Sequence, residues 1–178
     1  MPSEANKNGL SRNEQLCIFS DASVDSKLAT GFGAYLAVAE SELGLIDSEA
    51  DILHGRLKIR QFTATAPTPL EIETMLWALQ EVMSRPPGDI ILFTDSQSMI
   101  DLPRRRNRLE RSGFTGSASG KTLKHAALYQ AFYQAQDRLG FKLVKLKGHL
   151  KRADKTRFDR IFSYVDKASR KALREYRK

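Results

Sequence analysis

The chain has 178 residues, enough for one α/β domain with a sizeable core, and its ordinary composition excludes a largely disordered protein. A formal net charge of +8 favours a polyanionic partner. The single cysteine, Cys17, excludes an internal disulfide and a cysteine-based zinc site, and no apolar run reaches membrane-spanning length. We therefore expect a flexible tail at 1–14, one domain at 15–178, and a cytoplasmic protein that does not contact membranes.

Three strands are expected in the first third of the chain. Residues 15–22 contain an apolar run typical of a strand that is buried on both faces, and 30–38 follow as a glycine-rich second strand. Alternation from Ile52 to Phe62 predicts a third, half-exposed strand. No intervening segment is long enough for a crossover helix, so the three strands should form an antiparallel meander.

A helix–strand alternation is expected in the rest of the chain. Pro67 and Pro69 end the third strand and favour the start of a helix at 70–83, and the strand at 89–94 should run parallel to the first. The later elements are expected to be a helix from about Gln97, a basic segment, a helix at 122–139, a strand at 141–147 and a helix at 156–176. The pattern predicts an α/β fold with one mixed five-stranded sheet and helices on both faces.

Four acidic residues occupy the ends of these expected elements. Asp21 and Asp95 close two apolar strands, Glu71 lies in the first turn of a helix, and Asp166 lies in the last helix. Carboxylates at buried strand ends are costly unless a cation neutralises them, and the carboxyl ends of adjacent parallel strands meet at one edge. Oxygen ligands favour Mg²⁺ or Mn²⁺, and two such ions about 3.5–4 Å apart can catalyse phosphodiester cleavage.

Each acid also has an ordinary structural explanation. Asp21 can cap a turn, Glu71 can favour a helix N-terminus, Asp95 can cap the next helix, and Asp166 can pair with Arg170. Taken singly, these explanations are at least as good as metal binding. The joint occurrence of the four acids, in this order and on these elements, favours a site.

Six segments in chain order resemble the motifs of type 1 ribonuclease H. They are Phe19-Ser20-Asp21-Ala22-Ser23, Gly31-Phe32-Gly33-Ala34, Leu70-Glu71-Ile72, Phe93-Thr94-Asp95-Ser96, Lys147-Gly148-His149 and Val165-Asp166-Lys167-Ala168. The resemblance implies a ribonuclease H-like fold and a monomeric endonuclease that cuts the RNA strand of RNA–DNA hybrids. It also implies two Mg²⁺ ions (or Mn²⁺) held by the four acids, 5′-phosphate and 3′-hydroxyl products, and a nucleic-acid contact at Ser23.

The chain departs from the family pattern in two places. Residues 65–69 are Thr-Ala-Pro-Thr-Pro, where family members often have asparagines that contact the 2′-hydroxyls of the hybrid, which leaves the preference for hybrids open. The interval from Gly-His to the last acid is also longer than usual. Asp159 is therefore an alternative to Asp166, which is favoured by the small residues that follow it, and Glu73 is a lesser alternative to Glu71.

His149 follows the fifth expected strand, on a loop beside the acids. In that setting it can shuttle a proton or assist product release, although a histidine on a surface loop is more often inert. Lys147 and Lys151 flank it and belong to a basic rim that should contact phosphates.

The densest basic run contains Arg104, Arg105 and Arg106, and it is followed by a Gly/Ser-rich segment that ends at Lys121. We expect this run to interrupt a helix, and it resembles the basic protrusion that some ribonucleases H lay against the DNA strand. Phe114 is a candidate for stacking on the nucleic acid.

Two other functions compete with a ribonuclease H. One is a different nuclease on the same scaffold, such as a resolvase or an integrase-like enzyme. The other is a catalytically silent module that binds hybrids. Retention of all four acids argues against the silent module.

Overall fold

The computed structural model describes residues 14–44, 55–63, 65–84, 89–117, 119–147 and 152–178. Nearly all of the expected tail at 1–14 lies outside these residues. The loop that carries His149 and Lys151 also lies outside them.

The described strands form one mixed five-stranded sheet, as expected. In chain order they are β1 (Leu16–Asp25), β2 (Thr30–Ala39), β3 (Lys58–Thr63), β4 (Ile90–Thr94) and β5 (Lys142–Lys145). Their order across the sheet is β3-β2-β1-β4-β5. The pairs β1–β2 and β2–β3 are antiparallel, whereas β1–β4 and β4–β5 are parallel, which confirms the predicted meander and the predicted direction of β4.

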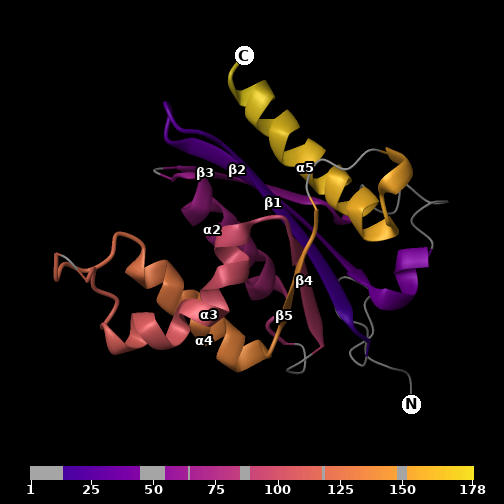
Figure 1. Ribbon diagram of the computed structural model, residues 1–178. Coiled ribbons are helices and arrows are strands. Elements are labelled where there is room, and N and C mark those ends of the chain that lie inside the picture. The colour runs from indigo at the N-terminus through magenta and orange to yellow at the C-terminus, as the bar shows by residue number, and fades with distance from the viewer. Residues whose placement is uncertain (1–13, 45–54, 64, 85–88, 118, 148–151) are drawn as a thin grey trace.

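The four long helices are divided between the two faces of the sheet. They are α2 (Pro67–Glu81), α3 (Gln97–Arg111), α4 (Ala126–Leu139) and α5 (Arg157–Tyr176). Short 3₁₀ helices follow β2, at Glu40–Gly44, and precede α5, at Arg152–Asp154. Figure 1 shows α5 alone on one side of the sheet, with α2, α3 and α4 on the other. Within the described ranges, no helix is both long and apolar enough to cross a membrane.

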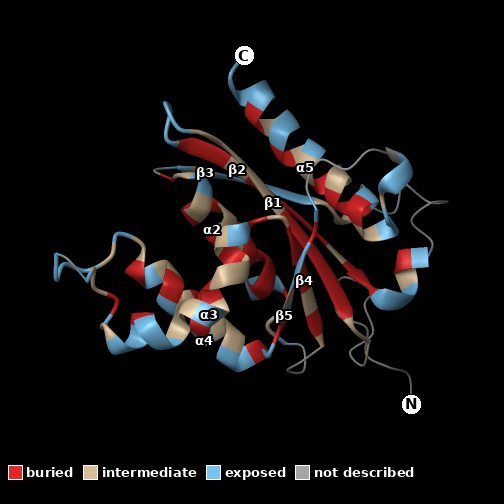
Figure 2. Cartoon of the chain, in the orientation of Figure 1, coloured by how far each residue is buried: buried red, intermediate tan, exposed pale blue. Residues whose placement is uncertain are grey.

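The core has one apolar layer on each side of β1, because successive strand residues point to opposite faces. Ile18 belongs to the cluster with α2 and α4, and Phe19 belongs to the cluster with α5. The ring of Phe19 stacks on Phe93, which stacks on Phe158 of α5, with centroid separations of 4.6 and 4.9 Å. In Figure 2 the buried residues accordingly follow the central strands and the sheet-facing sides of the helices. The side chain of Asp21, two residues beyond Phe19, lies on the α5 face.

Four predicted boundaries are wrong. The first strand extends to Asp25, beyond its expected end at residue 22, so Asp21 lies within β1 and does not close it. The third strand begins at Lys58, because Gly55 and Arg56 are helical and the Arg56 guanidinium pairs with Glu42 at 2.6 Å. The run at 104–111 lies inside α3 and does not interrupt it, since arginine favours helices. The next helix begins at Ala126, because Thr122 is held in an isolated bridge to Thr115.

Strand β3 is one edge of the sheet, and its side chains are largely exposed. The guanidinium of Arg60 lies over the rings of Phe62 and Trp77, 5.2 and 5.9 Å from their centroids. Ile59 keeps 45% of its surface exposed, and Lys58 is exposed beside it. The first half of this edge strand is therefore basic.

Candidate active site

Two glycines of β2 allow α2 to pack unusually close to the sheet. A Cβ atom at Gly33 would lie 2.1 Å from Oγ1 of Thr74, and one at Gly31 would lie 2.4 Å from Cδ2 of Leu70. Neither position can carry a side chain without moving the helix or its residues. This close approach brings the start of α2 down to the sheet. Because the helix begins at Pro67, Glu71 follows its first turn, whereas the sequence predicted that it lies within that turn.

Asp21 is the central acid of the site. Its Oδ2 accepts a hydrogen bond from Oγ of Ser169 on α5 at 2.7 Å. Burial raises the pKa of Asp21 to about 7; the Ser169 hydrogen bond opposes that rise, and repulsion from Asp166 and Asp95 adds to it. Acids from α5 and from the end of β4 therefore lie close enough to Asp21 on β1 to repel its charge.

Ser96 connects Glu71 with the start of α3. Its Oγ donates to Oε2 of Glu71 at 2.5 Å and accepts from the backbone N–H of Met99 at 3.3 Å as the helix N-cap. Burial also raises the pKa of Glu71, and the negative charge of Asp95 adds to the rise, although the Ser96 hydrogen bond opposes it. The backbone N–H of Ser96 donates to Oγ1 of Thr94 at 3.1 Å, so Asp95 lies between two anchored neighbours.

The two residues of α5 that could be the fourth acid of the site, Asp166 and Asp159, have different surroundings. Asp166 faces the Asp21 region, and its Oδ1 pairs with Nε of Arg170 at 2.6 Å. Asp159 instead completes a capping box, in which its Oδ2 accepts from the N–H and the hydroxyl of Thr156 at 2.9 and 2.6 Å. It is only 7% exposed and already has its partners.

Glu73, the alternative to Glu71, also has another partner. Its Oε2 accepts a hydrogen bond from Oγ1 of Thr65 at 3.0 Å. The backbone N–H of Thr65 in turn donates to the carbonyl of Ala29 at 3.1 Å. Glu73 therefore helps to hold the residues that precede α2, whereas Glu71 is the acid that interacts with Asp95.

The donor set fits a hard divalent cation in its chemistry, because it consists of carboxylate oxygens. Across the described ranges, however, no group of three or more His, Cys, Asp or Glu side chains is already arranged to hold a metal ion. Each of three carboxylates has a protein partner instead: Ser169 for Asp21, Ser96 for Glu71 and Arg170 for Asp166. A cation would exchange some of these contacts for its own.

The remaining predicted residues of this region are only partly described. The side chain of Ser23 is half-buried, with its Oγ 3.1 Å from Oγ of Ser169, and Lys147 is exposed beyond β5. His149 and Lys151 lie outside the described residues. The contacts of Ser96 and Ser169 with the acids were not predicted from the sequence. A signal for Ser169 was present, because it follows Asp166 by three residues and so shares its helix face.

The basic residues of α3 differ in how firmly the protein itself holds them. Arg104 pairs with Asp101, yet its side chain is 78% exposed. Arg106 binds the Asp137 carboxylate through two nitrogens, at 2.5 and 2.7 Å, and Nε binds Glu110 at 2.8 Å. The hydrogen bonds that Arg106 donates, first to Asp137 and then to Glu110, raise the pKa of Arg106.

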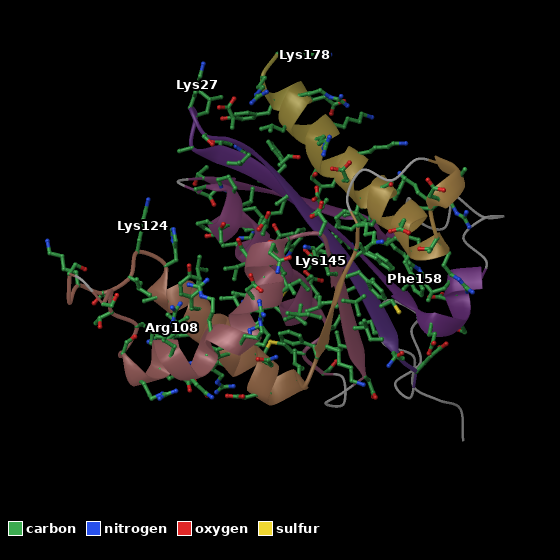
Figure 3. All side chains as sticks on the ribbon, in the orientation of Figure 1. Lys27, Arg108, Lys124, Lys145, Phe158 and Lys178 are labelled. Carbon is green, nitrogen blue, oxygen red and sulfur yellow. The ribbon has the colours of Figure 1, made fainter. Side chains whose placement is uncertain are left out.

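The other members of this basic surface lie at the same end of the molecule. The guanidinium of Arg105 lies 5.4 Å from the ring centroid of Tyr129, and Lys121 is exposed. Figure 3 shows Arg108 and Lys124 projecting from the end formed by α3 and α4, away from α5.

The stacking role expected for Phe114 is wrong. Its side chain is only 8% exposed and belongs to the core cluster on the α2 face of the sheet. The ring lies 6.3 Å from that of Tyr133 on α4. Burial of the ring anchors the turn after α3 and leaves no face for a base.

No family model matches the sequence, and no curated protein matches it. Solved structures do match over most of the chain. LC9-RNase H1, a type 1 RNase H with the type 2 active-site motif, has a TM-score of 0.63 and 15% identity over 97% of this chain and 73% of its own. The foamy viral protease-reverse transcriptase in complex with dsDNA has a TM-score of 0.58 and 12% sequence identity, and the match covers 86% of this chain and 95% of that one.

The foamy viral protease-reverse transcriptase in complex with RNA/DNA hybrid has a TM-score of 0.62 and 10% identity, over 96% of this chain and 22% of that one. At such identities the likeness concerns the fold. The sheet order β3-β2-β1-β4-β5, with helices on both faces, is that of a ribonuclease H-like fold, as the resemblance implied.

Proposed function

We propose that this chain is a metal-dependent endonuclease that cuts the RNA strand of RNA–DNA hybrids and leaves 5′-phosphate and 3′-hydroxyl ends. The observation that carries the proposal is the approach of two acids to Asp21: Asp166 of α5 and Asp95, which follows β4, lie close enough to its buried carboxyl group to repel its charge. Buried like charges are unfavourable unless a cation is bound among them. Without a cation these acids destabilise the folded state, and a bound cation would remove that cost, so the arrangement favours a cation site.

The metal ligands are assigned to Asp21, Glu71, Asp95 and Asp166, with two Mg²⁺ ions, or Mn²⁺, as the cations. When bound, these ions supply an activated water and stabilise the leaving 3′ oxygen. The chain itself orients the carboxylates: Ser96 holds Glu71 while it caps α3. We assign His149 to proton transfer.

The substrate is assigned from charge and from the complexes of structural neighbours. Two of these neighbours were solved with dsDNA and with RNA/DNA hybrid. Phosphate contacts are assigned to Ser23, Arg104, Arg105, Lys121, Lys147 and Lys151. Arg106 is kept as a weaker contributor, because a phosphate has to compete with Asp137 and Glu110 for its guanidinium.

The first test offers labelled RNA–DNA hybrid, double-stranded RNA and double-stranded DNA with Mg²⁺ or Mn²⁺. We expect hybrid cleavage that EDTA abolishes, and a loss on the order of 100-fold or more in Asp95→Asn, or about 2.7 kcal/mol of transition-state stabilisation. Asp154→Asn is the matched control, because Asp154 is exposed on the 3₁₀ helix before α5. Cutting of DNA alone indicates a resolvase-like enzyme, and tight binding without cleavage indicates a silent module.

A second test separates the two acids of α5. Asp159→Ala breaks the capping box and should cost about 1 kcal/mol of folding free energy while cleavage persists. Asp166→Asn loses an ion pair whose partners are 25% and 53% exposed, so its stability should change little while cleavage is lost. Urea unfolding and hybrid cleavage, measured on both variants, check the assignment; the reverse pattern would transfer the ligand role to Asp159.

A further inference from the structure

Ser169 is the one fully buried polar side chain that contacts Asp21 among the residues described. None of its surface is exposed, and it lies on α5, opposite β1. Its Oγ is 2.7 Å from Oδ2 of Asp21, 3.0 Å from the carbonyl oxygen of Asp166 and 3.1 Å from Oγ of Ser23. One hydroxyl therefore touches three residues of the candidate site.

The single hydroxyl hydrogen of Ser169 determines which of these three contacts it can donate to. A serine hydroxyl has one hydrogen to donate and lone pairs with which to accept. The carboxylate of Asp21 is the stronger acceptor, and its contact is the shortest of the three, so Ser169 donates to Asp21. Ser23 is then able to donate to Ser169, and the Asp166 carbonyl is left as a competing acceptor for the same proton.

We propose that Ser169 is a positioning residue for metal binding, which fixes the Asp21 carboxylate through Oδ2 before a cation arrives. The proposal rests on the proposed function, because Asp21 is a ligand only there. Hydrogen-bonding partners of metal ligands hold those ligands in place, and their loss typically weakens metal binding or activity about 10- to 100-fold. A rigid, buried donor on α5 lowers the cost of ordering Asp21 when the ion binds.

The contact also joins α5 to β1 at the level of the acids. Ser169 and Asp166 are three residues apart and share one face of α5, so the rotation that directs Ser169 to Asp21 also directs Asp166 there. Alanine at 169 preserves the helix and removes only the hydroxyl. Its effect should therefore fall on the orientation of the carboxylate and leave the fold intact.

The experiment measures Mn²⁺ affinity by titration calorimetry on the free protein, without nucleic acid. We expect about 10-fold weaker Mn²⁺ binding in Ser169→Ala, and partial recovery in Ser169→Thr, which restores a hydroxyl. Ser163→Ala is the matched control, a serine on the same helix that contacts Lys155. Hybrid affinity measured in EDTA should be the same in the wild-type chain and in Ser169→Ala.

The outcomes separate this inference from the proposed function. Mn²⁺ affinity within twofold of wild type in Ser169→Ala overturns the positioning role, even when the wild-type chain cuts hybrids. Weaker Mn²⁺ binding that Ser169→Thr does not restore, together with a large loss of stability in urea, reduces the contact to a structural one and overturns the inference as well. A wild-type chain that binds Mn²⁺ but cuts no hybrid removes the proposed activity alone.

Discussion

At the scale of single residues, the environment of Asp21 sets the character of the site. The carboxyl group of Asp21 on β1 is largely buried, and two further acids, Asp166 and Asp95, lie close to it. Water cannot fully solvate its charge, and hydrogen bonds from Ser169 and from the backbone of Ala22 compensate only in part. Below about pH 7 the folded protein without metal therefore favours the protonated form of Asp21, and above that pH it favours the carboxylate.

This preference predicts a pH dependence of stability. The pKa of Asp21 is raised from 3.8 to about 7 in the folded state, so its protonation stabilises the fold fully below about pH 4, and this stabilisation is lost as the pH rises through 7. Asparagine mimics the protonated form. In EDTA, Asp21→Asn should match wild type near pH 4 and exceed it at pH 8 by on the order of 2–4 kcal/mol.

Urea unfolding of both proteins across this range measures the effect. If the free energies of unfolding of wild type and Asp21→Asn change in parallel with pH, the raised pKa of Asp21 is contradicted. Mn²⁺ at pH 8 supplies the control, because it should stabilise the wild-type chain more than Asp21→Asn.

At the scale of elements, the distance between α2 and the sheet decides where Glu71 lies. Gly33 makes that distance possible, since Thr74 fills the space that a Cβ atom would need. Gly33→Ala should destabilise the fold by about 1–3 kcal/mol and displace the first turn of α2. Gly44→Ala is the control, because nothing lies within 4 Å of its added Cβ.

Thermal unfolding and Mn²⁺ affinity, measured together, check this prediction. A shift of helix α2 should weaken metal binding as well as stability, since Glu71 moves with the helix. Unchanged unfolding in Gly33→Ala would show that the α2 contact is softer than its distances indicate.

Elements with strong local signals could be predicted from the sequence, and those shaped by distant contacts could not. The apolar runs of β1 and β4 and the prolines in the first turn of α2 located these elements to within a few residues. The start of β3 was missed because Arg56 is held by Glu42, an ion pair that alternation does not reveal. The strand ends predicted that Asp21 and Asp95 lie close together, but the partner of Asp21 depends on how α5 is rotated against β1.

At the scale of the whole molecule, the net charge of +8 is only partly available to a polyanion. Arg106 shows why: two acids already bind its guanidinium, and its side chain is 30% exposed. Arg104 has one ion-pair partner and is 78% exposed. A single exposed ion pair, such as that between Arg104 and Asp101, is weak, and a phosphate can readily displace the carboxylate.

This difference predicts which arginine controls the salt dependence of binding. Replacing a residue that contacts phosphate lowers the slope of log K against log salt by about 1. Arg104→Gln should show that change, whereas Arg106→Gln should change the slope less and cost more stability. Hybrid binding across a salt series in EDTA measures both slopes. Equal slopes for the two variants would contradict the assignment, and Lys27→Gln, on the β1–β2 hairpin, is the matched control.

The basic edge of β3 has a consequence for the behaviour of the protein in concentrated solution. An open edge offers unpaired amide and carbonyl groups, which can join a second copy into a continuous ten-stranded ribbon. Lys58 and Arg60 would then be brought close to the same cations on the incoming strand. Electrostatic repulsion between these cations therefore disfavours pairing of two copies along this strand.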